Sequence, residues 1–129
     1  MRLAAFLLCS VLLCAESAHV AINPATAKWV HANDGSDSVI LRQDDTATEY
    51  LVRYPAGHVF RPHWHSVNER IVLLEGRLSF RQGDRPESFL DSGGYAFLPA
   101  KEVQHTSCVS TTRCMFYVYW DGKLDFHPE

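Results

Sequence analysis

The sequence predicts an all-β protein, and two observations carry that prediction. From residue 38 onward, short apolar or alternating runs recur between clusters of turn-forming residues, a pattern typical of β-strands. No stretch of this region repeats apolar residues with the 3.6-residue period of a helix. The runs occupy residues 38–42, 49–54, 69–74, 77–81, 95–98 and 115–120. Strands of this length and spacing indicate a β-sandwich or a β-barrel.

Size and charge narrow the class of protein. A chain of 129 residues is long enough for one domain of ordinary size. The 12 Lys and Arg residues are outnumbered by 15 Asp and Glu residues, which gives a formal charge of −3. Proteins that bind nucleic acid or anionic membrane surfaces carry a basic surplus instead. We therefore expect no nucleic acid and no membrane surface among the partners of the folded domain.

The first residues have the layout of a secretory signal peptide. Arg2 precedes an apolar run over residues 3–14, and small residues follow it. The run is too short to span a bilayer well. We predict a signal peptide over residues 1–17, cleaved near Ser17 or Ala18, and hence a secreted, extracellular protein without a membrane anchor after cleavage.

The remaining chain divides into three parts. Residues 18–37 are expected to form an N-terminal arm or edge strand, in which Ala25–His31 fits either a short helical turn or an edge strand. Residues 38–120 contain the predicted strands, and residues 121–129 are expected to form an irregular C-terminal strap.

Two cysteines remain after signal cleavage. Cys108 and Cys114 are separated by five residues, among them Ser110, Thr111 and Thr112, which suit a tight turn. In an oxidising compartment an even pair favours a disulfide across a β-hairpin, with two reduced, buried thiols as the alternative. Because the closed loop is short, the bond is expected to stabilise the fold only modestly.

A group of polar residues carries the chemistry. Alternate residues of a strand share a face, so His63 and His65 present two imidazoles side by side. Residues 66–68 suit a turn, after which Glu69 can add a carboxylate to the same face. Two imidazoles and a carboxylate form an incomplete coordination shell for a divalent metal. The alternative is a metal-free polar cluster in which His acts as an acid or base.

The spacing of these residues resembles the first conserved motif of the cupin superfamily. Gly57, five residues, His63, one residue, His65, three residues, Glu69, six residues and Gly76 match every specified position of that motif. The resemblance implies a single cupin-type jelly-roll β-barrel over residues 38–120, with the metal inside.

The second cupin motif is matched in part, which leaves the fourth ligand open. Gly93 and Pro99 fit, but Lys101 replaces a glycine, and Gln104 occupies the position of the expected His, with His105 next to it. Motif spacing and strand alternation favour Gln104, whereas metal preference favours the imidazole of His105. Adjacent strand residues face opposite ways, so only one of the two joins the site without a bulge. Spacing and alternation together make Gln104 the preferred fourth ligand, with His105 as the alternative.

The resemblance implies a mononuclear metal-binding cupin, which the signal peptide predicts to be secreted. Its donor set suits Fe(II) or Mn(II), with Zn, Ni or Cu as further options. Within the superfamily this scaffold supports dioxygenases, decarboxylases and isomerases that act on small organic molecules. The alternative is a non-catalytic cupin that binds a small ligand or senses the metal itself, since fold alone does not determine function.

Two further expectations concern partners. Arg61 has the same strand parity as His63 and His65, so it is a candidate for pairing with an anionic substrate; the alternative is a solvated surface arginine. Small cupins commonly pair through their sheets, so the resemblance implies a homodimer.

Overall fold

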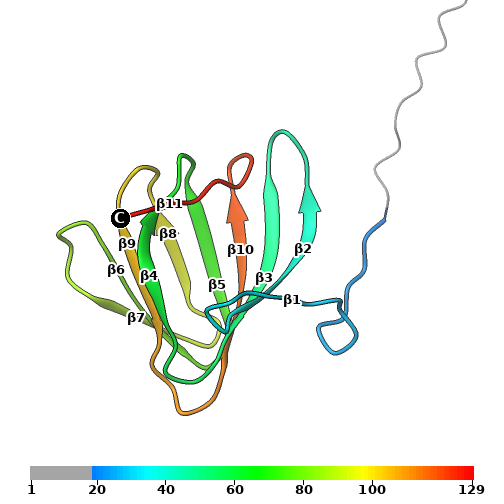
Figure 1. The fold of residues 1–129 in the computed structure, drawn as a ribbon, viewed down its shortest axis with the longest axis horizontal. Coiled ribbons are helices and arrows are strands. Elements are labelled where there is room, and N and C mark those ends of the chain that lie inside the picture. Colours follow the sequence, from blue (N-terminus) through cyan, green and yellow to red (C-terminus); the bar gives the residue numbers. More distant parts are fainter. Residues whose placement is uncertain (1–18) are drawn as a thin grey trace, which may run out of the picture.

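A computed structural model describes residues 19–129 as an all-β jelly roll, which confirms the predicted fold class (Figure 1). The predicted signal peptide, residues 1–17, lies outside the described residues. The strands are β1 (Val30–His31), β2 (Asp37–Gln43), β3 (Thr48–Tyr54), β4 (Val59–Trp64), β5 (Glu69–Glu75), β6 (Arg77–Gln82), β7 (Ser88–Asp91), β8 (Tyr95–Leu98), β9 (Gln104–Cys108), β10 (Cys114–Trp120) and β11 (His127–Pro128).

The strands form two antiparallel sheets. One sheet has the order β1-β2-β3-β10-β5-β8 and the other β11-β4-β9-β6-β7. From β3 to β6 and again from β8 to β11, successive strands alternate between the sheets, as in a jelly roll. Within residues 19–129 the two sheets are not joined by hydrogen bonds into a closed barrel, so the predicted barrel is a two-sheet sandwich with open edges.

The six runs singled out in the sequence correspond to β2, β3, β5, β6, β8 and β10, with ends that differ by at most one residue. The segment left undecided, Ala25–His31, contains a turn and then the edge strand β1. The short edge strand β7 was not predicted, because only Leu90 among its residues is buried and no alternation shows.

Side chains on the inner faces of the two sheets form the core. Ile71, Leu73, Leu78, Leu98 and Val118 are almost completely buried. Strand β9 alternates as predicted, with Gln104, Thr106 and Cys108 facing inward. The burial of β9 therefore fixes which of its residues reach the interior at either end of the sandwich.

The predicted disulfide between Cys108 and Cys114 is present and closes the turn between β9 and β10. Gly76, the last position of the first cupin motif, lies against this turn with φ of +83°. A Cβ atom there would be 2.7 Å from the Arg113 carbonyl oxygen and 2.9 Å from Cys114 Sγ. Only glycine provides both the backbone conformation and the space that this contact requires.

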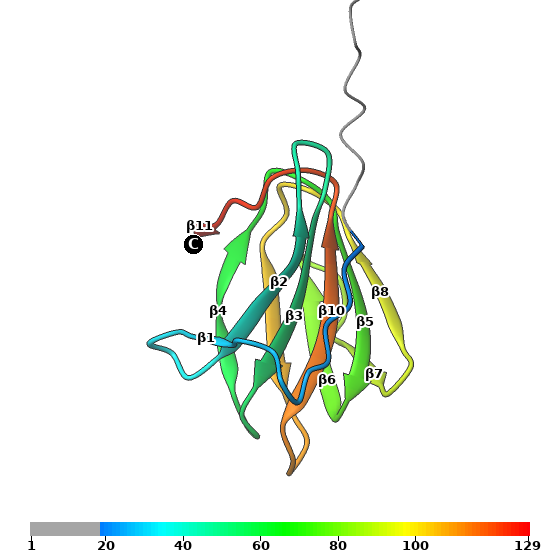
Figure 2. The same cartoon turned by 90° about the vertical axis from the view of Figure 1, so that its right-hand side faces the viewer.

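The two terminal segments pack on the outside of the sandwich. The N-terminal arm runs past β10 and β3 (Figure 2). There Trp29 stacks on the Arg53 guanidinium at 3.7 Å. The C-terminal segment runs from β10 across one end of the sandwich, and β11 pairs with β4 (Figure 1). In the part of the chain that is described, no helix is long and apolar enough to cross a membrane.

Candidate functional site

Four polar side chains are buried together at one end of the sandwich. His63 lies on β4 and His65 directly after it, Glu69 begins β5, and Gln104 begins β9. Their exposed fractions are 5 %, 5 %, 6 % and 3 %. We call His63, His65, Glu69 and Gln104 the polar cluster. It lies at the opposite ends of β9 and β10 from the disulfide.

The side chains of the polar cluster contact one another. Gln104 Nε2 donates a hydrogen bond to Glu69 Oε2 at 2.6 Å and lies 3.1 Å from His63 Nε2. His65 Nε2 lies 3.7 Å from Glu69 Oε2. The neighbouring His105 belongs to the half-buried positions of β9 that alternate with the inward ones. The structure thus brings Gln104, and not His105, to the two imidazoles and the carboxylate.

Backbone carbonyls fix the tautomers of both imidazoles. His63 Nδ1 donates to the Arg61 carbonyl oxygen at 2.8 Å, and His65 Nδ1 donates to the Asp125 carbonyl oxygen. Because each ring carries its proton on Nδ1, each Nε2 carries a lone pair, and the lone pair of His63 accepts a hydrogen bond from Gln104 Nε2. Both lone pairs are on the side of Glu69 and Gln104. In metal sites, a hydrogen bond from the other ring nitrogen to a backbone carbonyl orients a ligating histidine in this manner.

Burial determines the charge of the cluster. It lowers the pKa of His63 to about 4 and also lowers the pKa of His65, so both imidazoles are neutral at pH 7. Burial raises the pKa of Glu69 to about 7, and the hydrogen bond from Gln104 opposes this shift. Neutral imidazoles are ready to bind a metal, whereas Glu69 releases a proton when it becomes a ligand.

The donor atoms of the polar cluster are of the types that bind a divalent transition metal, but they do not converge on one point in this structure. Within residues 19–129, no group of three or more His, Cys, Asp or Glu side chains is arranged to hold a metal ion. The Gln104 amino group lies between His63 and Glu69, and Gln104 Oε1 is buried without a hydrogen-bond partner. Two imidazole nitrogens, a carboxylate and an amide oxygen would suit Fe or Mn. Metal binding stays a prediction.

A cavity of about 180 Å³ opens beside the polar cluster. His63, His65 and Glu69 form one side of it. The remaining wall is largely aromatic and includes Tyr50, Tyr54, Phe60, Phe116, Trp120 and Phe126. We call this the inner cavity. Its apolar wall and buried polar groups are typical of a small-molecule site.

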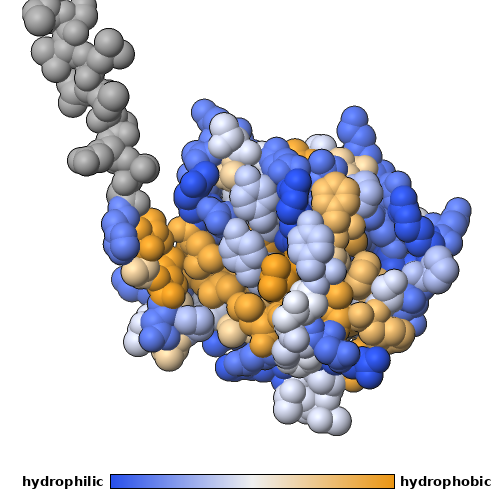
Figure 3. Space-filling model, turned by 180° about the vertical axis from the view of Figure 1, so that it is seen from behind, coloured by the Kyte–Doolittle hydropathy of each residue, from blue (hydrophilic) through white to orange (hydrophobic). Residues whose placement is uncertain are grey.

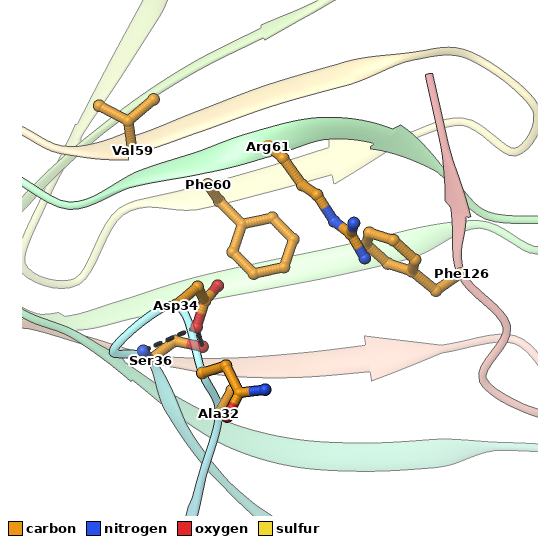
Figure 4. A pocket seen from close by; sticks show the side chains of 8 residues that line it. Ala32, Asp34, Ser36, Val59, Phe60, Arg61 and Phe126 are labelled. Carbon is orange, nitrogen blue, oxygen red and sulfur yellow. Dashed lines mark hydrogen bonds between the residues drawn. The ribbon is translucent and has the colours of Figure 1, made fainter.

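Arg61 lies beside the inner cavity rather than within it. A shift of register between Phe60 and His63 in the pairing of β4 with β9 breaks the alternation along β4, so the parity argument that placed Arg61 on the face of His63 does not hold. The Arg61 guanidinium lies over the Phe126 ring at 4.6 Å (Figure 4). Phe126 in turn stacks on His63 at 4.9 Å. Phe126 therefore separates Arg61 from the polar cluster.

The C-terminal segment contributes two features that the sequence interpretation missed. The Asp125 carbonyl holds His65, and the Phe126 ring covers His63. A signal was available, because Leu124 and Phe126 are alternate apolar residues in an otherwise polar tail, and both line the inner cavity.

Lys101, where the second cupin motif has glycine, adopts φ of +66° and is the one non-glycine residue of the described chain with a positive φ. Its amide donates to the His65 carbonyl oxygen at 2.8 Å. The left-handed conformation costs a residue with a Cβ about 1 kcal/mol. The backbone of this loop thus keeps the shape that a glycine would favour.

The model of the ChrR Cupin-like domain matches residues 17–122, nearly the whole described chain. The chain belongs to this cupin family. The resemblance seen in the sequence motifs is therefore confirmed, and the jelly roll around the polar cluster is a cupin fold.

Individual proteins of several kinds are similar to this cupin in sequence or in structure. It is 30 % identical over 92 residues to the DNA damage-repair/toleration protein DRT102 of Arabidopsis thaliana, and it spans 28 % of that protein's length and 70 % of its own. It is 25 % identical to the DMSP lyase DddQ of Ruegeria pomeroyi DSS-3, with a TM-score of 0.66 over 81 % of this chain and 61 % of that one.

A further solved structure shares the fold alone. The polyketide cyclase RemF of Streptomyces resistomycificus is 15 % identical, with a TM-score of 0.73 over 86 % of this chain and 85 % of that one. Cupins of this architecture thus include enzymes with different reactions.

Proposed function

We propose that this cupin binds one divalent transition metal through His63, His65 and Glu69, with Gln104 as the fourth side chain, and acts on a small organic molecule in the inner cavity. The observation that supports this most is the pair of imidazole tautomers. Both Nδ1 protons are held by backbone carbonyls, so both Nε2 atoms carry lone pairs on the side of the Glu69 carboxylate, and a metal would replace the Gln104 amino group as the partner of His63 Nε2. An Fe(II) or Mn(II) ion is the preferred occupant, and Zn, Ni and Cu remain options.

The chain's own residues supply the rest of the site. When bound, the metal would act as a Lewis acid toward a carbonyl or carboxylate oxygen of the ligand. The aromatic wall of the inner cavity excludes water from that ligand and so strengthens electrostatic interactions within the site. Burial raises the pKa of Glu69 to about 7 in the metal-free protein, so Glu69 would give up its proton when it binds the metal near neutral pH.

A second candidate function is ligand or metal binding without turnover. Gln104 favours it, because an amide in place of the expected imidazole is a weaker ligand for transition metals. A weakly held metal suits a protein that senses the metal or the ligand.

Metal analysis tests the first part of the proposal. Protein purified without chelator is expected to carry about one metal ion per chain. His63→Ala and His65→Ala are each expected to abolish metal retention, whereas the matched variant His105→Ala is expected to retain it. Substoichiometric metal in the wild type that is unchanged in both variants would refute the metal site.

A substrate screen separates the two candidate functions. Metal-loaded wild-type protein is mixed with a panel of dicarboxylates, diketones and flavonoids, and oxygen uptake, carbon dioxide release and isomerised product are measured. Turnover that disappears in His63→Ala supports an enzyme. Saturable binding without turnover across the panel favours the binding or sensing function.

Two expectations about the environment of the protein accompany this proposal. We infer a secreted protein, and the Cys108–Cys114 disulfide is consistent with an oxidising compartment. We also propose a homodimer formed through the six-stranded sheet. Leu74, Tyr95 and Phe97 are 42 %, 57 % and 45 % exposed on β5 and β8, and apolar residues gather on the face seen in Figure 3. Sedimentation velocity over a range of concentrations tests the dimer, and a monomer throughout would refute it.

A further inference from the structure

A second pocket lies next to the inner cavity. It has a volume of about 540 Å³ and is formed by β4 and the β1–β2 loop (Figure 4). We call it the outer pocket. It shares Ser36, Phe60 and Phe126 with the inner cavity, so the two spaces are neighbours across the Phe126 ring. A molecule of modest size in the outer pocket would lie beside the residues that cover the polar cluster.

Arg61, which lines this pocket, differs from the other arginines of the described chain. Six of them form ion pairs with Asp or Glu, namely Arg42, Arg53, Arg70, Arg77, Arg85 and Arg113. Arg81 donates to the carbonyl oxygen of Gly83. Among residues 19–129, Arg61 is thus the one arginine whose guanidinium has neither an acidic nor a carbonyl acceptor. One face of it rests on Phe126, and its N–H groups stay free.

The rest of the outer pocket determines which ligand shape and charge it accepts. Val59, which is 72 % exposed, and the rings of Phe60 and Phe126 form an apolar surface next to Arg61. Asp34 lies on the other side of Phe60 (Figure 4), where Oδ1 accepts hydrogen bonds from Ser36 N at 2.9 Å and from Ser36 Oγ at 2.7 Å. This carboxylate disfavours a second negative charge at that end of the pocket.

We propose that the outer pocket binds a small organic monoanion, with its carboxylate on Arg61 and its apolar body on Phe60 and Phe126. Arginine suits this task because its planar fork of N–H groups matches a carboxylate and can pair with it bidentately. The inference deepens the proposed function by naming the substrate class, and it rests on that function only in assigning the reacting end of the molecule to the inner cavity. Phe60 and Phe126 line both spaces, so a ligand that reaches the inner cavity from the outer pocket would have to displace the Phe126 ring.

Phenylacetate, phenylacetamide and phenylmalonate provide a monoanion, a neutral analogue and a dianion with the same ring. Each is titrated into the wild-type protein, metal-free after dialysis against chelator, and followed by amide NMR. We expect phenylacetate to bind best and to shift amides in residues 32–36 and 59–61. Arg61→Gln is expected to weaken it about tenfold, as loss of a charge-assisted hydrogen bond does. The matched variant Arg81→Gln, on β6, is expected to bind like the wild type.

The possible outcomes separate this inference from the proposed metal site. Absence of saturable binding to metal-free protein, or equal binding by Arg61→Gln, would overturn the inference. Binding that requires metal and ignores Arg61→Gln would place the anion on the metal, which overturns the inference while supporting the metal site. Binding that requires Arg61 in a protein that never retains metal would uphold the outer pocket and refute the metal site.

Discussion

The two ends of strands β9 and β10 are built in opposite ways. At one end, Cys108 and Cys114 are disulfide-bonded, at most 1 % exposed, and lie in the same core as Leu73 and Leu78. At the other end, Gln104 is as well buried but lies among ionisable side chains, and one of its polar atoms has no partner. Apolar burial stabilises a fold, whereas buried polar groups cost free energy unless every atom is paired.

This difference assigns different tasks to the two ends. The disulfide end contributes a covalent bond and apolar packing, and the polar end carries a buried carboxylate and an unpartnered amide oxygen that are expected to destabilise the metal-free fold. Binding sites commonly keep such unfavourable groups because a ligand or metal compensates for them when it binds. Substitutions at the two ends are therefore expected to have effects of different size and, at some positions, of different sign.

The largest effect is expected in the core at the disulfide end. Leu73 is completely buried, so Leu73→Ala should lower the free energy of unfolding by about 2–5 kcal/mol. The neighbouring Leu74 is 42 % exposed, and Leu74→Ala serves as the matched control with a change of about 0.5 kcal/mol or less. Urea denaturation measures both. An equal decrease in the free energy of unfolding of the two variants would contradict tight packing of the core around Leu73.

Glu69→Gln should stabilise the metal-free protein, and more so as the pH rises. Burial raises the pKa of Glu69 from 4.5 to about 7, so between these values the folded protein binds more protons than the unfolded chain. Stability conferred by this group is present below about pH 4.5 and is lost as the pH rises toward 7. Glu69→Gln has no carboxyl group and does not lose this stability. The free energy of unfolding of the variant should therefore exceed that of the wild type by an amount that grows with pH to about 3 kcal/mol at most.

Urea denaturation of chelator-treated protein at about pH 5 and about pH 8 measures this trend. The lowered pKa of His63 acts in the opposite direction, but it is present in both proteins and cancels in their difference to a first approximation. If the difference in free energy of unfolding between Glu69→Gln and the wild type became smaller as the pH rises, burial would not raise the pKa of Glu69.

Removal of the disulfide should have a smaller effect. The double variant Cys108→Ala/Cys114→Ala opens a short loop, so the free energy of unfolding should fall by about 2 kcal/mol. Thermal unfolding with and without a reducing agent measures it, since the reducing agent should destabilise the wild type alone. Metal retention is expected to stay at the wild-type level, and its loss in this variant would show that the two ends are not independent.

The fourth side chain of the polar cluster is tested by metal affinity. Gln104→Ala should weaken metal binding about tenfold, in the range that supporting residues of metal sites contribute. His105→Ala, which removes the neighbouring half-buried imidazole, should leave affinity unchanged. Competition with a coloured chelator measures both affinities. The reverse ranking would assign the ligand role to His105.

Lys101→Gly is expected to give the smallest change, a stabilisation of about 1 kcal/mol or less, because glycine adopts the left-handed conformation without a Cβ clash. The adjacent exchange Glu102→Gly, at a residue without positive φ, should destabilise instead. Thermal unfolding distinguishes the two signs. Destabilisation by both exchanges would indicate that the Lys101 side chain makes a stabilising contribution.

The sequence predicted the fold well where alternation and turn residues agree. Strands such as β5 and β10 were found because each has one buried face, and the first cupin motif brought His63, His65 and Glu69 together because turns of fixed length join their strands. The inward phase of β9 identified Gln104 as the residue beside them.

Other features depend on contacts between distant segments, which a local pattern does not contain. The irregularity in β4 that turns Arg61 outward arises from pairing with β9, more than forty residues further along the chain. The contribution of Phe126 depends on the docking of a short tail, where two alternate apolar residues give only a weak signal. Tertiary pairing, rather than propensity, decides both.

The hydrogen bond from His65 to the Asp125 carbonyl spans 60 residues of sequence. During synthesis, the segment that carries both imidazoles is made well before residue 125. Until that later segment docks, the proton of His65 is free to sit on either ring nitrogen. The Nδ1 tautomer of His65, which leaves Nε2 unprotonated, is therefore fixed only once the C-terminal segment has docked.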